Sequence, residues 1–130
     1  MRTYVKMRSG ETFDVPVFYE QGGLAVTPWI VVGKEPFPSK EHFAITQLRS
    51  GAVIVSTPYT RLPDAIYVCQ QLAYMLDWKL NSYEQVEAAL KAGQYPALRD
   101  FLAEEAYQGL VKKEESIQRM VRRVQREEDR

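Results

Sequence analysis

The sequence predicts an α+β fold: an antiparallel β-meander of about five strands followed by about three helices, the last long and C-terminal. The first half is rich in β-branched and aromatic residues, in short runs that glycine turns separate. The second half places its apolar residues at helical spacing, behind a proline and a capping box. Because the strands precede the helices instead of alternating with them, this order indicates α+β rather than α/β.

Three β-rich runs open the chain, and turn residues separate them. The runs are Thr3–Met7, Thr12–Tyr19 and Leu24–Val32. The segment Arg8–Glu11 predicts a hairpin turn between the first two runs. Gly22 and Gly23 readily supply the positive φ that a tight turn before the third run needs. Pro16 and Pro28 each remove a donor from the strand ladder, so we expect edge positions, bulges or bends there.

A polar loop and a hairpin complete the predicted sheet. The loop, Gly33–Glu41, is broken by prolines and carries one aromatic residue, Phe37, between two of them. The runs His42–Leu48 and Ala52–Ser56 then flank the turn Arg49–Gly51. Both faces of these two runs carry apolar residues, which predicts a central hairpin covered by helices on one face and partly covered on the other.

Three helices are predicted after the sheet. A proline at the first helical position and an apolar stripe indicate a core helix over 63–76. The capping box that begins at Ser82 predicts a short helix near 83–92. Pro96 opens a third helical run, in which Gly109 is the expected weak point because glycine costs about 1 kcal/mol relative to alanine.

Charge and cysteine content limit the environments and partners that we expect for the protein. Its 17 basic and 17 acidic residues balance, so no overall field directs the chain toward nucleic acid. The net charge is +2 over residues 1–62, −4 over 63–111 and +2 over 112–130. Cys69 is the single cysteine, which excludes an internal disulfide and favours a reducing compartment. Without a signal-peptide pattern after Met1 or a membrane-length apolar run, we expect a soluble, cytoplasmic protein with no membrane contact.

The residues offer little catalytic chemistry. One histidine, His42, and one cysteine, Cys69, cannot build a four-ligand zinc site, and we expect the first at the surface and the second in the core. No nucleophile elbow, phosphate loop or dinucleotide-binding glycine motif occurs. The carboxylates that could converge from separate elements are Asp14, Asp64, Asp77 and Asp100, and their spacing gives no sign that they do. We therefore expect a non-enzymatic protein with no cofactor and no bound metal.

Residues 112–130 form a predicted amphipathic and charged C-terminal helix that follows a globular domain over 1–111. Its apolar face consists of Ile117, Met120, Val121 and Val124, at helical spacing. Its opposite face carries Arg119, Arg122, Arg123 and Arg126, at the same spacing two positions later. Arginine suits bidentate contacts to phosphate or carboxylate, so these eight residues are the main candidates for binding a partner.

Several environments fit this helix, and the sequence leaves them open. A solvated helix would be held by pairs such as Glu115–Arg119 and Arg123–Glu127. A protein partner would take the apolar face into a groove, whereas nucleic acid would contact the arginines directly. A homodimer would pair two apolar stripes at residues that repeat by sevens, namely Leu110, Ile117 and Val124.

Two further candidate surfaces lie in the first half of the chain. Phe37, on a proline-bounded loop, is a candidate anchor for a partner. Five aromatic residues from different predicted strands could line one sheet face and stack bases, as in single-strand binders. They are Tyr4, Phe13, Tyr19, Trp29 and Phe43. Core packing of these side chains is the alternative.

One stretch of the chain combines an aromatic strand, a Ser-Gly turn, a second strand and an alanine-bearing helix ending in Asp77-Trp78. This succession, over residues 42–78, resembles a hairpin-plus-helix unit of small uncharacterised bacteriophage and plasmid proteins. The resemblance transfers no active site. It implies a small modulator of a host machine, for which transcription is the commonest target.

We therefore expect a regulatory binding protein of the phage or mobile-element type. Its charged helix would modulate host transcription by contacting RNA polymerase or a σ factor. The alternative is a nucleic-acid-binding protein that uses the C-terminal arginines and the aromatic sheet face.

Overall fold

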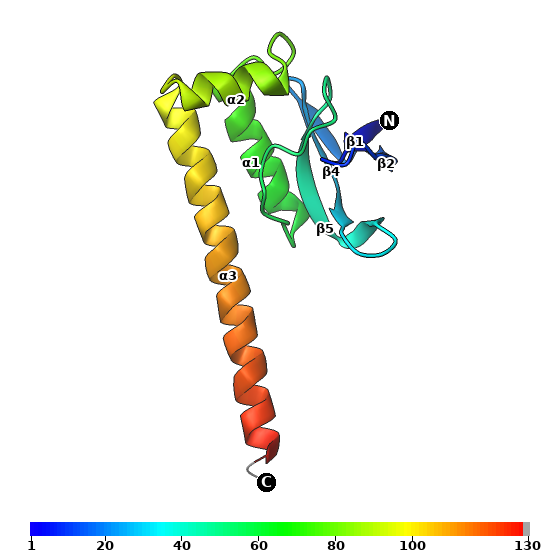
Figure 1. Cartoon of the computed structure of the whole chain (residues 1–130), viewed down its shortest axis with the longest axis vertical. Helices are drawn as coiled ribbons and strands as arrows, with labels where there is room; N and C mark the ends of the chain where they lie inside the picture. The colour runs from blue at the N-terminus through cyan, green and yellow to red at the C-terminus, as the bar shows by residue number, and fades with distance from the viewer. Residues whose placement is uncertain (129–130) are drawn as a thin grey trace.

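The computed structural model describes residues 1–128 and confirms the α+β class, with antiparallel strands first and helices after them. The strands are β1 (Arg2–Lys6), β2 (Thr12–Pro16), β3 (Tyr19–Gln21), β4 (Leu24–Val31) and β5 (Phe37–Gln47). The helices are α1 (Leu62–Met75), α2 (Tyr83–Lys91) and α3 (Pro96–Glu128). In Figure 1, α1 lies across the sheet that contains β4 and β5, and α3 runs beside α1 before continuing well past the domain.

The strands form two small sheets instead of one meander. β1 pairs with β2, and a second sheet has the order β3-β4-β5. The predicted run Thr12–Tyr19 is divided because the chain changes partners after Pro16. The Val17 N–H donates to the Met1 carbonyl at 3.0 Å, whereas the Phe18 N–H donates to the Val26 carbonyl at 2.9 Å. One β-rich run therefore supplies a strand to each sheet.

The proline expectations for β2 and β4 agree with the structure. Pro16 is the last residue of β2, where its missing N–H interrupts no ladder, and Pro28 pairs with Phe43 immediately before a register shift at Ile30. The shift is the bulge that the ladder needs after a residue without a donor. After this shift, Ile30 lies on a different side of β4 from Leu24 and Val26. The structure shows this because Ile30 packs in the smaller apolar cluster, whereas Leu24 and Val26 pack in the main one.

The predicted strand Ala52–Ser56 is wrong, and β5 is longer than predicted. The turn at Arg49–Gly51 is present, but the following segment pairs with β5 only through isolated bridges, at Thr46↔Val53 and Phe43↔Tyr59. β5 instead begins inside the predicted loop, where Phe37 pairs with Val31. Apolar character at 52–56 reflects packing of this irregular segment against the core and not a second regular strand.

All three predicted helices are present. The core helix expected over 63–76 is α1, and Ser82 caps α2 by accepting from the Gln85 N–H while the Gln85 side chain accepts from the Ser82 N–H. α3 continues through Gly109 without a break and spans the expected boundary between residues 111 and 112. The last two residues of the predicted terminal helix, 129–130, lie outside the described residues.

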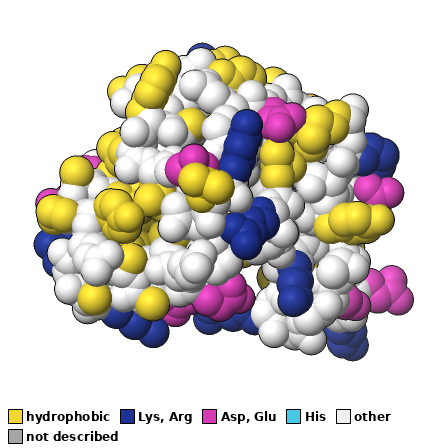
Figure 2. All heavy atoms as spheres, turned by 90° about the horizontal axis from the view of Figure 1, so that it is seen from above, with side chains coloured by type: hydrophobic (Ala, Val, Ile, Leu, Met, Phe, Trp, Pro, Cys, Tyr) yellow, Lys and Arg dark blue, Asp and Glu magenta, His cyan; other side chains and the backbone are white. Residues whose placement is uncertain are grey.

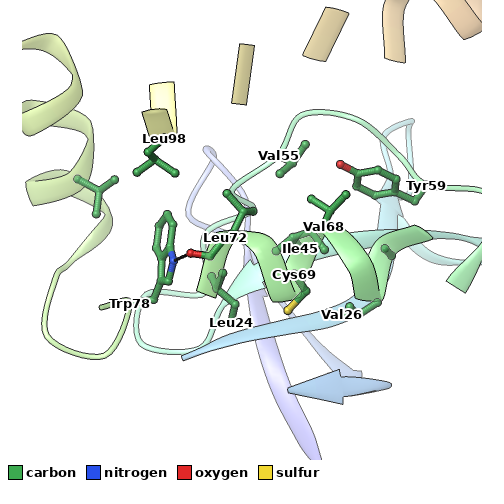
Figure 3. Packing of buried hydrophobic residues seen from close by; sticks show 12 residues of the cluster. Leu24, Val26, Ile45, Val55, Tyr59, Val68, Cys69, Leu72, Trp78 and Leu98 are labelled. Atoms are coloured by element: carbon green, nitrogen blue, oxygen red, sulfur yellow. Dashed lines mark hydrogen bonds between the residues drawn. The ribbon is translucent and has the colours of Figure 1, made fainter. Parts of the chain in front are cut away.

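The main core lies between the three-stranded sheet and the helices (Figure 3). Leu24 and Ile45 from the sheet meet Leu72 of α1, and Trp78 and Leu98 close the cluster from the side of α2 and α3. The Trp78 indole is completely buried and donates to the Leu72 carbonyl at 2.8 Å, so its polar atom is satisfied. A smaller cluster of Val5, Val15 and Ile30 holds the β1–β2 hairpin on the opposite side of β4.

A buried glutamine connects the end of β5 to the loop after α1. Gln47 is fully buried, and its Nε2 donates to the Trp78 carbonyl at 2.9 Å and to the Asn81 carbonyl at 2.6 Å. Its Oε1 accepts from the Ser50 hydroxyl at 2.7 Å. Gly23 permits this packing, because a Cβ there would lie 2.9 Å from the Trp78 carbonyl carbon and its φ is +89°. The network holds the loop that leads to α2 and α3.

Candidate functional site

The first part of α3 is anchored to the domain by apolar contacts of Leu98, Phe101 and Leu102 and by two hydrogen bonds. Leu98 is buried in the main core. The Thr57 hydroxyl donates to the Glu105 carbonyl at 2.9 Å, and the Tyr59 hydroxyl donates to the Glu105 carboxylate at 2.8 Å. Both donors belong to the irregular segment that pairs with β5. This segment therefore sets the direction in which α3 leaves the domain.

Gly109 packs closely against the domain near the end of the anchored part of α3. A Cβ at this position would overlap the Thr57 hydroxyl and would lie 2.7 Å from the Thr57 Cγ2. The glycine therefore lets the helix approach the 57–59 segment, and its role is close packing rather than a break in the helix. Glycine costs about 1 kcal/mol in helix propensity relative to alanine, and the contacts that the close approach permits offset this cost.

Beyond Gly109, α3 stands clear of the domain as an arm, which we define as residues Leu110–Glu128 (Figure 1). At 1.5 Å per residue the arm is about 28 Å long. Its apolar side chains are open to solvent: Leu110 is 67% exposed, Ile117 52%, Met120 64%, Val121 49% and Val124 48%. Most solvent-facing positions in a monomeric protein are polar, so this row of apolar side chains is an unpartnered surface.

The arm carries two chemically different faces, as the sequence predicts. At 100° per residue, Ile117, Met120, Val121 and Val124 share one side, and Arg119, Arg122, Arg123 and Arg126 share the opposite side. Each of these eight residues is exposed. The structure thus brings the eight predicted arm residues together on one helical element.

The apolar side of the arm does not continue the side of α3 that faces the domain. The domain-facing positions are Leu98, Leu102, Glu105 and Gly109, as their contacts show. The positions Leu110, Ile117 and Val124 lie about 100° around the helix axis from them. A partner helix could therefore contact the apolar side of the arm without displacing the domain.

The arginine side of the arm makes few internal contacts. Among the side chains that the structure describes, which exclude those of Lys113, Ser116 and Glu128, ion pairs join Arg2 to Asp14, Lys91 to Glu87 and Arg99 to Asp100, and none involves an arginine of the arm. Arg119 contacts only the Glu115 carbonyl, at 3.4 Å, so the expected pairing with the Glu115 carboxylate is not formed. Between Ile117 and Arg126 there are four arginines and no acidic residue, a local charge of +4.

Charge elsewhere is more evenly mixed. Viewed from the end opposite the arm, hydrophobic, basic and acidic side chains alternate over the surface (Figure 2). The arm, with four arginines and no acidic residue between Ile117 and Arg126, therefore differs in charge pattern from the face that Figure 2 shows.

Phe37 is not brought to the arm. It begins β5, pairs with Val31 and is 55% exposed. The start of β5 lies on the side of the domain away from α3 (Figure 1). If Phe37 binds a partner, it does so at a separate surface.

The five aromatic residues of the expected stacking face do not share a face. Val5 and Phe13 are opposite each other in the β1–β2 ladder and pack in the small cluster, whereas Tyr4 opposes Asp14 on the other, exposed side. Tyr19 and Phe43 pack against the main core. Core packing, the alternative interpretation, accounts for Phe13, Tyr19 and Phe43, so a stacking platform built from all five is wrong.

The dispersed carboxylates have structural roles or lie apart. Asp14 pairs with Arg2, and the Asp77 carboxylate accepts from the Lys79 and Leu80 N–H groups at 2.9 and 3.2 Å. Asp64 lies in the first turn of α1, and Asp100 lies on α3. In the part of the chain that the structure describes, no three histidine, cysteine or acidic side chains are grouped so as to hold a metal ion.

Cys69 and His42 occupy different environments. Cys69 is completely buried on α1, as expected, and burial raises the pKa of its thiol to about 11. His42 lies inside β5 rather than at its start, is half-buried, and its Nδ1 is 3.5 Å from the Ser39 hydroxyl. A thiol with a raised pKa is a weak nucleophile at neutral pH.

Sequence reasoning missed the residues that orient the arm. Thr57, Tyr59 and Glu105 fix the direction of α3, and none of them belongs to a recognisable motif. The sequence signal that could have indicated them was Gly109, since a glycine inside a long helical run often marks close packing. The contact partner of that glycine, Thr57, is 52 positions away and carries no such signal.

A scan against protein-family models and searches of curated proteins and of solved structures found no match to this chain. Among the helices described, none is both long enough and apolar enough to cross a membrane.

Proposed function

We propose that this protein is a non-enzymatic regulatory binding protein whose arm docks onto an acidic surface of a protein partner. The observation that carries the proposal is the arm itself. It extends about 28 Å beyond the domain and presents a +4 arginine run on one side and an apolar row on the other. A helix with no role beyond its own domain gains nothing by exposing five large apolar side chains.

The chemistry of the arm favours an anionic partner. Arginine binds carboxylates and phosphates bidentately and retains its charge at all physiological pH values. Among the described side chains, no carboxylate forms an ion pair with the arginines of the arm. The residues involved in this contact are Arg119, Arg122, Arg123 and Arg126, with apolar support from Ile117, Met120, Val121 and Val124.

The proposed partner is the transcription machinery of a host, either RNA polymerase or a σ factor. This part of the proposal rests on the resemblance of residues 42–78 to small phage and plasmid proteins, and on the suitability of a charged helical arm for such docking. The anchoring of α3 at Glu105 supports it, because a directed arm loses less conformational entropy on binding than a free tail would.

The test is a binding measurement with purified bacterial RNA polymerase holoenzyme, core enzyme and free σ factor. The variant Arg122→Glu/Arg123→Glu should lose binding, while its unfolding midpoint stays near that of the parent because both residues are exposed. A matched control, Lys34→Glu/Lys40→Glu, makes the same change of charge on the domain and should bind normally. Equal affinity of the parent and the arm variant for every probe would contradict the proposal.

Nucleic acid is the second candidate, and the +4 run between Ile117 and Arg126 is the observation that favours it. Direct binding predicts that the association constant for duplex or single-stranded DNA falls steeply with salt, with a slope of about −0.7 to −0.9 per phosphate contact. It would depend on the arginines alone, since the aromatic side chains do not form a common face. Absence of DNA binding at low salt would exclude this candidate.

A further inference from the structure

The apolar row of the arm belongs to a longer heptad pattern. Placing Ile117 at position a puts Ala103, Leu110 and Val124 at the other a positions, and Ala106 and Met120 at d positions. All of these residues lie within the unbroken helix α3. The sequence places one charged residue, Lys113, in this register between Ala103 and Val124. Six of the seven seam positions in this stretch are therefore apolar.

The seam is open along the helix. Ala103, Leu110, Ile117, Met120 and Val124 are exposed, and Ala106 is half-buried. The domain occupies the neighbouring side of α3, at Leu98, Glu105 and Gly109. At 100° per residue, the a positions of the seam lie roughly 80–140° around the helix axis from Leu98 and the d positions roughly 40–80°. The small side chains of Ala103 and Ala106 allow a second helix to approach even where the domain is close.

We propose that a second copy of this chain covers the seam, so that two α3 helices form a parallel, in-register, two-stranded coiled coil. The proposal rests on the proposed function in treating the arm as a contact surface. It leaves the arginine side to the protein partner and reassigns Ile117, Met120 and Val124 from that partner to a second copy of the chain. β-branched residues at a positions, such as Ile117 and Val124, favour two-stranded coils.

The parallel register matches apolar residues better than the reverse orientation. In register, Leu110, Ile117, Met120 and Val124 each meet their own counterparts, and the one like-charged pair in this stretch of the seam is Lys113 against Lys113. In an antiparallel pair that places Ile117 against Met120 of the other copy, Leu110 would meet Glu127 of that copy. Two-fold symmetry of the parallel pair also places the two domains on opposite flanks of the coil, because each domain lies to one side of its own seam.

The area available to the contact reaches the lower limit for a specific interface. Complete burial of the exposed leucine, isoleucine, methionine and valine side chains would remove at most about 1,000 Å² from water in the pair. The arginines do not oppose the contact. Arg119, Arg122 and Arg126 fall at the outer c and f positions, on the far side of each helix from the seam. The dimer therefore leaves two arginine faces free.

The experiment is sedimentation equilibrium of the full chain over a range of micromolar concentrations. We expect a mass approaching twice 15.0 kDa as concentration rises. The substitution Ile117→Glu should raise the dimer dissociation constant at least about tenfold, because it places like charges in the seam. The matched control Gln118→Glu introduces the same charge one position away, outside the seam, and should dimerise normally. A monomer at all concentrations, or equal weakening by both variants, would overturn the proposal.

Orientation is tested by cross-linking under mild oxidation. Val124→Cys should form a disulfide between copies, because a parallel in-register pair places position 124 opposite itself. Gln125→Cys, outside the seam, is the control and should not. Cys69 is fully buried and does not compete. A dimer in which neither engineered cysteine cross-links would overturn the parallel arrangement.

The two proposals on the arm can fail separately. Arg122→Glu/Arg123→Glu should leave the sedimentation mass unchanged, since Arg122 faces outward and Arg123 flanks the seam. A dimer whose arginine variant still binds every polymerase and DNA probe would contradict the proposed function alone. A monomer that loses polymerase binding in the arginine variant would contradict the dimer alone.

Discussion

The Tyr59 hydroxyl donates a hydrogen bond of 2.8 Å to the Glu105 carboxylate, across 46 positions of sequence. It joins the irregular segment beside β5 to the first part of α3, between one and two turns before the start of the arm. Burial, the hydrogen bond to Glu105 and the charge of that carboxylate raise the pKa of the Tyr59 phenol far above its usual range. The hydroxyl therefore remains a donor, and the direction of the arm is set by this contact together with that of Thr57.

Removing the phenolic hydroxyl should weaken the anchor of α3. We expect Tyr59→Phe to lower the free energy of unfolding by about 1–2 kcal/mol, because a hydrogen bond to a charged group is lost while the ring remains packed. Urea unfolding followed by circular dichroism measures the change. Tyr107→Phe, at an exposed position, is the control and should change it little.

A double-mutant cycle separates this contact from the packing around it. Glu105→Gln alone and Tyr59→Phe alone each remove part of the same interaction, so their effects should not add. An additive double variant would show that the hydroxyl and the carboxylate do not interact in solution.

Gly109→Ala should destabilise the protein, although alanine is the better helix former. The new Cβ would lie 2.7 Å from the Thr57 Cγ2, and such overpacking costs about 1–3 kcal/mol. The gain in helix propensity, about 1 kcal/mol, does not offset the upper part of that range. We expect a net loss of about 1 kcal/mol in the free energy of unfolding.

Thr57→Ala tests the cause of that loss. Alone it removes the hydrogen bond to the Glu105 carbonyl and should destabilise. In the Gly109→Ala background it also removes the overlapping atoms, so its cost there should be smaller. If the two variants are simply additive, close packing at this contact is not the reason for the glycine.

The sequence predicts the turns and helix starts correctly where neighbouring residues determine them. The capping box at Ser82, the turns at Gly10 and Gly23 and the helix start near Pro63 all depend on neighbouring residues, and all are present. The errors fall where distant partners decide. The apolar character of residues 52–56 predicts a strand. However, β5, the strand that would form a ladder with this segment, pairs with it only through the isolated bridge between Thr46 and Val53.

The same distinction applies to the candidate site. The two faces of the arm follow from helical periodicity alone, so the sequence predicted their residues correctly. The direction of the arm depends on Tyr59 and Glu105, which lie on different elements. Likewise, Tyr4 and Phe13 both read as strand aromatics, and only the ladder register shows that they lie on opposite faces.

Gln47→Leu should be among the most destabilising single substitutions. It removes both donors to the Trp78 and Asn81 carbonyls in a buried site, leaving these acceptors and the Ser50 hydroxyl without their partner. Unsatisfied buried polar groups cost about 1–3 kcal/mol each, so we expect a loss of about 2–4 kcal/mol. Thermal unfolding measures it.

Ser50→Ala is the graded control for this network. It removes the contact to the Gln47 Oε1 and the hydrogen bond that the Ser50 hydroxyl accepts from the Ala52 N–H, at a partly exposed position, and leaves both contacts of the Gln47 Nε2 in place. It should cost about 1 kcal/mol, less than Gln47→Leu. Equal effects of the two substitutions would show that the carbonyl contacts are not what makes Gln47 important.

Cys69 should react with thiol reagents only when the protein opens. Its side chain is fully buried and its pKa is raised to about 11 by burial, an effect that a backbone hydrogen bond from Gln21 partly reduces. A thiol whose pKa is higher in the folded state contributes stability that is complete below its unfolded value, 9.0, and is lost as pH rises toward 11. The difference in unfolding free energy between the parent and Cys69→Ala should therefore shrink over that interval, by about 2 kcal/mol at most. Ellman labelling at pH 8 measures the accessibility directly: the rate should rise with urea in step with unfolding, and rapid labelling without denaturant would show that the core around α1 is open.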